Sequence, residues 1–182
     1  MSARQIHGFK FEDAVKKILN IQEEKSYTSK WDIGDSISVK YIKVGGSIMM
    51  GDIKRQFEPL QTLTSVIILG RHQDRVCTDV CEVEVTAEIW SKLHGSLTLE
   101  EVTAFDKKLK SFPRGQHLEA KAYAKEWLAN NKHKIGMLGV NPKIDHNAQR
   151  RVQCSINTTN FNILFNVSTS PKFKVLIGGD FA

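Results

Sequence analysis

The alternation of apolar and polar side chains in the first quarter of the chain predicts a helix followed by a β-hairpin. In the stretch GFKFEDAVKKILN, Phe11, Val15 and Ile18 recur at the spacing of one helical face. This spacing predicts an amphipathic helix over residues 8–20. The stretches YTSKW and SISVKYIKV alternate instead with a period of two and are separated by DIGD, whose glycine and aspartates suit a tight turn. A hairpin over residues 27–44 is therefore predicted.

The central part of the chain predicts a short helix and a buried strand. In MMGDIKRQFEPL, Met50, Ile53 and Phe57 fall at helical spacing. The stretch TLTSVIILG is a nearly continuous apolar run ended by glycine, which is typical of a strand covered on both faces. The following VCEVEVTAEIW is compatible with a strand alone or with a strand that leads into a helix.

Two helices and then several strands are predicted in the second half. LTLEEVTAFDKKLKSF begins with Thr98 three residues before Glu101, a capping-box arrangement, and GQHLEAKAYAKEWLANNKH is rich in helix-forming residues. RRVQCSIN, FNILFNVS and FKVLIG are predicted to be strands, with turn residues between them. The whole order predicts an α/β or α+β fold, in which a mixed β-sheet is flanked by helices.

Length and composition fit one domain around a hydrophobic core, since the chain has 182 residues and 41% of them are hydrophobic. No run of about 18 apolar residues is present, so we expect no membrane-spanning helix. The N-terminal MSARQIHGFKFED lacks the apolar region of a signal peptide. We therefore expect a cytoplasmic location and no membrane partner. Cys77, Cys81 and Cys154 are expected to be reduced thiols, and the spacing of CTDVC does not favour a zinc site.

Positive charge is the compositional feature that bears on a partner. The formal net charge is +6 and the pI is about 9.2. These values fit a polyanion such as DNA, although many basic proteins bind none. Basic side chains gather within residues 107–151, in KKLK, FPRGQH, KAYAKEW, NKHK and QRR. This downstream half is therefore the better candidate for phosphate contacts.

The predicted hairpin carries a candidate catalytic group. Its period of two places Ser38 and Lys40 on one face of the second strand, and Asp32 at the end of the partner strand can lie near both. A carboxylate can hold a hard divalent cation while a lysine orients or activates the attacking water, which suits phosphodiester hydrolysis. One carboxylate is a poor Mg²⁺ site, and Glu12 or Asp52 could supply a second. The alternative is a solvated turn with a surface aspartate and lysine.

The order of these features resembles the core of the PD-(D/E)XK nuclease superfamily, in particular the type II restriction endonucleases. The resemblance covers roughly residues 8–70, with a glutamate-bearing helix, then WDI, then SVK in a strand, then a short helix and SVIILG. It implies a restriction-endonuclease-like core and a Mg²⁺ cofactor. It also implies that Asp32 is the first metal-binding aspartate, that Lys40 is the catalytic lysine, and that Glu12 is the helix glutamate that some members place beside the metals.

The chain departs from the pattern of this family at two positions. Trp31 precedes the aspartate, where the family has proline, and Ser38 stands where it usually has Asp or Glu. Some restriction endonucleases resemble this variant, with Ser or Thr before the lysine and the acid moved to the following helix. The resemblance therefore favours Asp52 over Asp35 as the replacement acid.

The stretch NPKIDHNAQRRVQCSIN is a candidate for base contacts. Arginine can bridge guanine O6 and N7, and Gln or Asn can pair with adenine N6 and N7, so such a loop and strand edge could read the major groove. The candidate DNA-binding residues are Lys143, His146, Asn147, Gln149, Arg150, Arg151 and Gln153. Two alternatives stay open: a solvated basic loop whose arginines pair with Asp145 or other carboxylates, and contacts to phosphate alone.

These features together predict a Mg²⁺-dependent type II restriction endonuclease that hydrolyses phosphodiester bonds of double-stranded DNA at a short specific site. We expect a homodimer, because a palindromic site is matched by two-fold protein symmetry. One nuclease domain is expected, with residues 1–95 as catalytic core and residues 96–182 as the helical and β-strand part that recognises DNA. The alternatives are a structure-specific repair or junction-resolving nuclease and a non-catalytic basic DNA-binding module.

Overall fold

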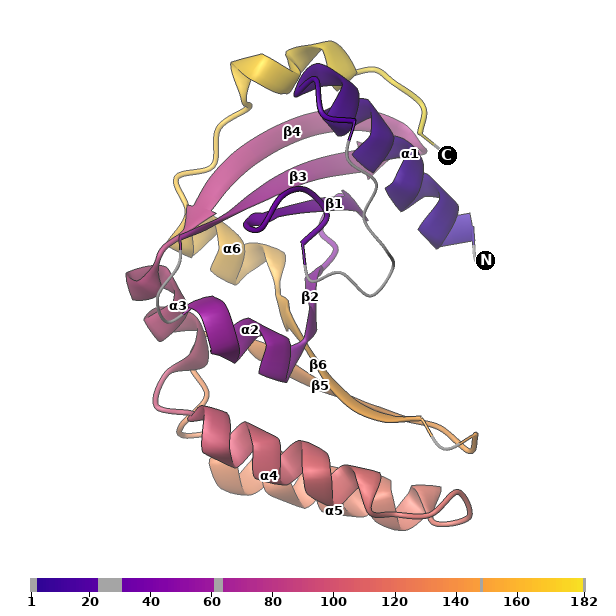
Figure 1. Ribbon diagram of the computed structural model, residues 1–182, viewed down its shortest axis with the longest axis vertical. Coiled ribbons are helices and arrows are strands. Elements are labelled where there is room, and N and C mark those ends of the chain that lie inside the picture. Colours follow the sequence, from indigo (N-terminus) through magenta and orange to yellow (C-terminus); the bar gives the residue numbers. More distant parts are fainter. Residues whose placement is uncertain (1–2, 23–30, 61–63, 148, 182) are drawn as a thin grey trace.

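The computed structural model describes residues 3–22, 31–60, 64–147 and 149–181 (Figure 1). In chain order its elements are α1 (Ala3–Ile18), β1 (Ile37–Lys43), β2 (Ile48–Asp52), α2 (Ile53–Leu60), β3 (Ser65–Gln73), β4 (Val76–Val85), α3 (Ala87–His94), α4 (Leu99–Lys110), α5 (His117–Asn131), β5 (Gly139–Ile144), β6 (Arg150–Ile156), α6 (Thr158–Leu164) and the 3₁₀ helix η1 (Pro171–Leu176). The described strands form sheet A (β1, β3 and β4) and sheet B (β2, β5 and β6). The predicted α+β class is confirmed, with its strands divided between two sheets.

Sheet A is mixed and has the strand order β1-β3-β4. β1 runs parallel to β3, and β3 runs antiparallel to β4. The first strand of the predicted hairpin falls on residues 27–31, and residues 27–30 lie outside the described residues. Trp31 belongs to no strand, and the segment before β1 is a turn with an isolated bridge between Ile33 and Ile37. In the part of the chain that is described, the partner of β1 is therefore β3.

Sheet B is antiparallel, with β6 between β2 and β5. The helical spacing of Met50 predicted that the short helix begins before Gly51, and this part of the prediction is wrong because Met50 lies in β2. Gly51 adopts a φ of +87°, and the register of β2 against β6 shifts between Met49 and Gly51. A residue with a Cβ is strained at this φ. The glycine therefore permits the bulge through which the chain passes from β2 into α2.

One face of sheet A is covered by α1 and η1 (Figure 1). The cluster between them contains Phe11 of α1, Val39 of β1, Ile68 of β3 and Phe173 of η1, all buried. β3 passes straight through Gly70, the glycine that was predicted to end it. A Cβ at this position would lie 2.4 Å from Cζ of Phe11, so the glycine lets α1 approach the sheet.

The opposite face of sheet A packs against α2, α3, α6 and sheet B. This larger core joins the two halves of the chain, since it contains Ile67 and Leu69 of β3 together with Val152 and Cys154 of β6. β6 also pairs directly with β2. The predicted catalytic part and the predicted DNA-recognition part therefore share one core and one sheet.

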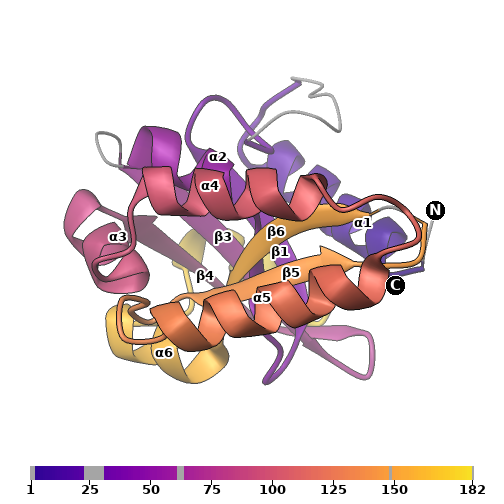
Figure 2. The ribbon, with the colours of Figure 1, turned by 90° about the horizontal axis from the view of Figure 1, so that it is seen from below.

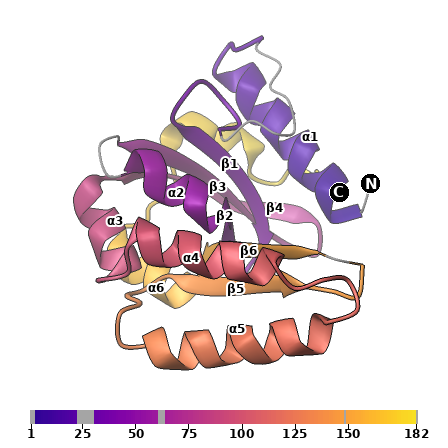
Figure 3. The ribbon, with the colours of Figure 1, turned by 60° about the horizontal axis from the view of Figure 1, so that its bottom comes forward.

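α4 and α5 form an outer layer over β5 and β6 (Figures 2 and 3). The predicted capping box is present: the side chain of Thr98 accepts from the backbone N–H of Glu101, and the Glu101 side chain accepts from the N–H of Thr98. α3 follows β4 after Thr86, so VCEVEVTAEIW is a strand that leads into a helix. None of the helices in the described ranges is long and apolar enough to cross a membrane.

The C-terminal segments FNILFNVS and FKVLIG were predicted to be strands, and both predictions are wrong. The first contributes to α6, whose N-terminus is capped by the Asn157 side chain, an acceptor for the backbone N–H of Asn160. The second contributes to η1, which begins at Pro171. β5 was not predicted, and it contains Pro142, which is tolerated because β5 is an edge strand of sheet B.

Candidate functional site

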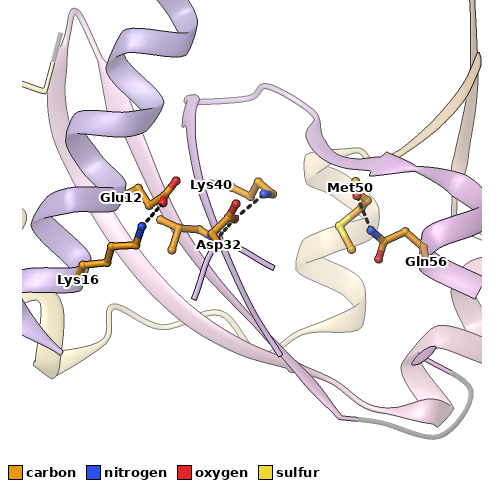
Figure 4. Close-up of polar contacts among 7 residues, drawn as sticks. Glu12, Lys16, Asp32, Lys40, Met50 and Gln56 are labelled. Atoms are coloured by element: carbon orange, nitrogen blue, oxygen red, sulfur yellow. Dashed lines mark hydrogen bonds and ion pairs between the residues drawn. The ribbon is translucent and has the colours of Figure 1, made fainter. Parts of the chain in front are cut away.

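Asp32 lies in the turn that leads into β1, and its carboxylate organises that turn. Its backbone N–H donates to the carbonyl of Ile37. Its side-chain Oδ2 accepts a hydrogen bond of 2.6 Å from the backbone N–H of Val39. The same oxygen lies 3.0 Å from Nζ of Lys40, which donates to it (Figure 4). The predicted proximity of Asp32 and Lys40 is therefore present, and it arises in the turn that leads from Asp32 into β1.

The Asp32–Lys40 pair is partly accessible to solvent. The side chain of Lys40 is 25% exposed and that of Asp32 is 26% exposed. Both contacts of the carboxylate use Oδ2, and Oδ1 has no hydrogen-bond partner among the described residues. One carboxylate oxygen therefore fixes the turn, while the other remains able to bind a ligand.

Ser38 lies beside this pair in β1 and is 8% exposed. It stands opposite Ile67 of β3 and, by the alternation of the strand, on the same face as Lys40. A serine hydroxyl is neutral, so Ser38 adds an oxygen to the site without adding negative charge. This position therefore cannot replace the second carboxylate in electrostatic terms.

Glu12 is committed to an interaction within its own helix. Oε1 of Glu12 accepts from Nζ of Lys16 at 2.6 Å, one turn along α1 (Figure 4). α1 packs against β1, so Glu12 belongs to an element that borders the Asp32 turn. Within the described residues, no hydrogen bond or ion pair joins Glu12 to Asp32 or Lys40.

Asp52 ends β2 and caps α2. Its Oδ1 accepts from the backbone N–H groups of Lys54 at 3.0 Å and Arg55 at 3.4 Å, which are among the unpaired donors at the start of this helix. Its second oxygen, Oδ2, makes no hydrogen bond to any described residue. Asp52 therefore resembles Asp32: one carboxylate oxygen accepts hydrogen bonds from the backbone, and the other makes none to a described residue.

These residues provide a limited fit for Mg²⁺. The described residues contain no cluster of three or more His, Cys, Asp and Glu side chains that could hold a metal. Magnesium is nevertheless commonly bound through one or two carboxylates, together with waters and substrate phosphates. Oδ1 of Asp32 suits such a site, which the phosphate of a bound substrate would complete, and Asp52 or Glu12 could contribute a second carboxylate.

Gln56 is a buried polar residue that the sequence interpretation missed. It lies in α2, is 5% exposed, and donates from Nε2 to the carbonyl of Met50 at 2.6 Å (Figure 4). Its Oε1 is buried without a hydrogen-bond partner among the described residues. The signal was available, because Gln56 is a polar residue directly beside Phe57 on the buried side of an amphipathic helix.

The predicted DNA-binding residues lie on the β5–β6 hairpin, whose turn is organised by Asp145. Its Oδ1 accepts from the backbone N–H groups of Gln149 at 2.8 Å and Asn147 at 2.9 Å. These hydrogen bonds, that from Gln149 being the stronger influence, lower the pKa of Asp145. Asn147 also accepts from Nη2 of Arg114, so its amide is engaged with the α4–α5 connection.

Arg150 is buried and holds the hairpin in place. It is 6% exposed, and its Nη1 donates to the carbonyls of Asp145 and Gln149 at 2.7 and 2.8 Å. Its Nη2 donates to the carbonyl of Pro113 at 3.2 Å, which links the hairpin to the α4–α5 connection. The geometry thus gives Arg150 a structural role, and its contact with DNA stays a prediction.

The other predicted DNA-binding residues differ in accessibility. Arg151 is exposed and lies opposite Lys143, whereas Gln153 is half-buried and lies opposite Asp52 of β2. His146 and Gln149 are exposed at the turn. β6 therefore carries an accessible arginine and, two residues further on, a glutamine beside the cap of α2.

The chain matches no protein-family model, no curated protein and no solved structure. The proximity of Asp32 and Lys40 and the exposure of the basic hairpin are the two structural observations that bear on function. Both concern residues that the sequence had singled out, and both are properties of a few side chains on the α+β scaffold. They support a function through their chemistry alone.

Proposed function

We propose that the protein is a Mg²⁺-dependent type II restriction endonuclease that hydrolyses phosphodiester bonds of double-stranded DNA at a short specific site. The observation that carries this proposal is the Asp32–Lys40 pair, in which Oδ2 accepts from Lys40 and from the backbone while Oδ1 stays available. In metal-assisted attack on a phosphodiester, such a carboxylate oxygen can bind the cation, and the neighbouring ammonium group can stabilise negative charge.

Asp32 and Lys40 would have different roles in this reaction. Oδ1 of Asp32 would hold the cation, with Asp52 or Glu12 contributing after its side chain turns toward the site. When bound, Mg²⁺ supplies Lewis-acid stabilisation of the charge that develops on the phosphate. Nζ of Lys40 has three donors, of which one is used by Asp32, so it can also donate to a phosphate oxygen or orient the attacking water.

The basic hairpin and α5 supply the binding surface of the proposed nuclease. Arg151 is exposed on β6, and Lys121 and Lys125 are exposed on α5, the helix that packs on β5. Exposed cationic side chains of this kind bind DNA mainly through its phosphates. A homodimer is part of the proposal, because two copies related by a two-fold axis would match the symmetry of a palindromic site.

A non-catalytic DNA-binding module is the second candidate. The observations that favour it are the neutral Ser38 beside the pair and the existing commitments of Glu12 to Lys16 and of Asp52 to the start of α2. In that case the Asp32–Lys40 ion pair serves only to fix the turn before β1. A repair or junction-resolving nuclease would use the same chemistry on a substrate chosen by its shape.

Plasmid and genomic DNA incubated with the purified protein test the proposal. With Mg²⁺ we expect discrete fragments, and with EDTA we expect intact DNA. The variant Asp32→Asn keeps an oxygen for the Val39 N–H but removes the charge, so its cleavage should be slowed by about 10²-fold or more. Asp74→Asn is the matched control, because Asp74 is exposed at the β3–β4 turn and its φ of +47° is one that asparagine tolerates.

The pattern of products separates the candidates. Discrete fragments whose ends share one sequence support the restriction enzyme. Cleavage of branched or mismatched DNA alone supports the repair nuclease, and retarded but intact DNA in every assay supports the binding module. Equal cleavage by the wild type and Asp32→Asn would contradict the assigned role of the pair.

A further inference from the structure

A hollow that contains neither Asp32 nor Lys40 lies where α6 packs on sheet A. α6 is on the face of sheet A opposite α1 (Figure 1). The cavity has a volume of about 550 Å³, which is within the range of pockets for small ligands, and it is open to solvent. It is lined by Arg71, Asn162, Ile163, Phe165, Asn166 and Val167.

Arg71 brings a positive charge with unused donors to this cavity. Its side chain is 18% exposed, and its Nε lies 3.7 Å from Oδ2 of Asp79, too far for a hydrogen bond. Nη2 makes only a long contact of 3.9 Å with Sγ of Cys81, and the guanidinium carbon lies 6.0 Å from the centre of the Phe161 ring. Nη1 has no hydrogen-bond partner among the described residues. Nε is buried, so the donors that can meet a ligand are those of Nη1 and Nη2, and because an arginine stays charged they favour an anionic acceptor.

Asp79 reduces this charge without occupying the cavity. It is absent from the lining, and its Oδ1 accepts from the hydroxyl of Thr169 at 2.8 Å. Asp79 therefore pairs with Arg71 from outside the hollow. The planar guanidinium can pair with a phosphate on its open edge while this carboxylate remains behind it.

The rest of the lining combines amides with apolar surface. Asn162 and Asn166 are exposed and stand four residues apart, and their side chains make no hydrogen bond to any described residue. Ile163 lies between them in sequence and is 68% exposed, so its apolar side chain is accessible to a ligand. Asparagine amides can pair with the edge of a nucleobase, and an apolar side chain can cover its face.

We propose that this cavity binds a single nucleotide, with the phosphate on Arg71, the base edge on Asn162 and Asn166, and the base face against Ile163. The lining offers a donor to an anion, amides to a polar heterocycle and an apolar wall, and a nucleotide is the ligand class that uses all three. The site is separate from the Asp32–Lys40 pair and does not depend on DNA cleavage. The nucleotide can be free in solution or part of a single-stranded nucleic acid.

Binding of defined probes to the full chain tests this site. The probes are deoxyadenosine 5′-monophosphate, deoxyadenosine, inorganic phosphate and a short single-stranded oligonucleotide, measured by calorimetry. We expect the nucleotide to bind and the nucleoside and inorganic phosphate to bind at least about tenfold more weakly, since each leaves part of the lining unpaired. Arg71-dependent binding of the oligonucleotide as well would identify single-stranded nucleic acid as a source, and binding of the mononucleotide alone would identify a free nucleotide.

Two pairs of variants make the result specific. Arg71→Gln should weaken nucleotide binding at least about tenfold, whereas Arg75→Gln in the exposed β3–β4 turn should not change it. Asn162→Ala should weaken it several-fold, whereas Asn130→Ala on the exposed surface of α5 should not. Asn162 is exposed, so this variant decides the matter if Arg71→Gln unfolds. Absence of nucleotide binding by the wild type, or unchanged binding by Asn162→Ala and Arg71→Gln, would overturn the proposal, and neither outcome depends on cleavage.

Discussion

The turn before β1 and the β5–β6 hairpin are both charged turns on the edge of a sheet, and they use their charges differently. In the first, Asp32 and Lys40 meet at 3.0 Å and leave one carboxylate oxygen available. In the second, Arg150 is 6% exposed and donates to three backbone carbonyls, while its neighbour Arg151 is exposed. The difference shows that a charged side chain near a turn is available for function only after the backbone donors and acceptors around it are satisfied.

The largest effect on DNA cleavage is expected from Lys40, the partner of Asp32 in β1. Lys40→Ala should slow DNA cleavage by about 10²–10³-fold, the cost of removing one donor that stabilises developing charge. Lys43→Ala is the matched control, because Lys43 lies in the same strand and is exposed. Single-turnover rates in Mg²⁺ measure both, and a comparable loss in both variants would point to a general effect of charge rather than to a catalytic lysine.

The second effect concerns the stability of the hairpin. Arg150→Ala should lower the free energy of unfolding by about 2–3 kcal/mol, because it removes the charged hydrogen bonds of a buried guanidinium to three backbone carbonyls. Arg151→Ala should change it by less than about 0.5 kcal/mol, as expected for an exposed side chain. Urea denaturation measures both variants. Equal stability of the two variants would contradict the claim that the hydrogen bonds of Arg150 stabilise the hairpin.

Arg151 should instead affect DNA binding. Arg151→Ala should weaken binding to all sequences to a similar degree and reduce the slope of log K against log salt by about 1, as for the loss of one phosphate contact. Binding isotherms at several salt concentrations give this slope. Loss of affinity for one DNA sequence only, with an unchanged slope, would assign Arg151 to base contacts instead.

A smaller effect distinguishes the two functions available to Asp52. Asp52→Ala should destabilise the protein by about 1 kcal/mol, because it removes the cap of α2, while Asp52→Asn should keep the cap and cost little. If Asp52 also supplies the second carboxylate, Asp52→Asn should lose cleavage while remaining stable. Full cleavage by this stable variant would leave Glu12 as the candidate, to be tested by Glu12→Gln against the exposed control Asp13→Asn.

The smallest effect is the pH dependence contributed by Asp145. Its pKa is lowered in the folded protein, so the folded state favours the carboxylate and this contribution to stability is present above the pKa of the unfolded chain. It is lost as the pH falls through the lowered folded value. Asp145→Asn should therefore flatten the stability profile below about pH 4. Unfolding curves over this acidic range test the prediction, and an unchanged profile in the variant would contradict it.

The features that could be predicted from the sequence are those determined locally. The capping box of Thr98 and Glu101 and the approach of Asp32 to Lys40 depend on residues close in sequence. β2 depends on pairing with β6, which is distant in the chain, while β5 pairs with β6 across a short turn. The sequences of β2 and β5 also contain Gly51 and Pro142. Such strands are specified by tertiary contacts more than by propensity.

The wrong strand prediction for FNILFNVS and the unpredicted burial of Arg150 also reflect contacts that a periodic pattern does not show. FNILFNVS contains apolar residues at spacings that suit a strand as well as one or two turns of helix, and the Asn157 cap decides for the helix. The burial of Arg150 could not be predicted either, because one of its acceptors is the carbonyl of Pro113, 37 residues away. Burial of a charged side chain through distant backbone groups leaves no periodic signal.

Single-turnover cleavage by the wild type, Asp32→Asn, Lys40→Ala and the double variant tests the central claim most directly. If the two residues act as one catalytic unit, each single variant should be slowed by about 10²-fold or more, and the double variant should be little slower than the slower single variant. If the fold reduction in the double variant equals the product of the two single reductions, the two residues act independently, which would contradict a shared role. A wild type that binds DNA in Mg²⁺ without cutting it would contradict the assignment of the protein as a nuclease.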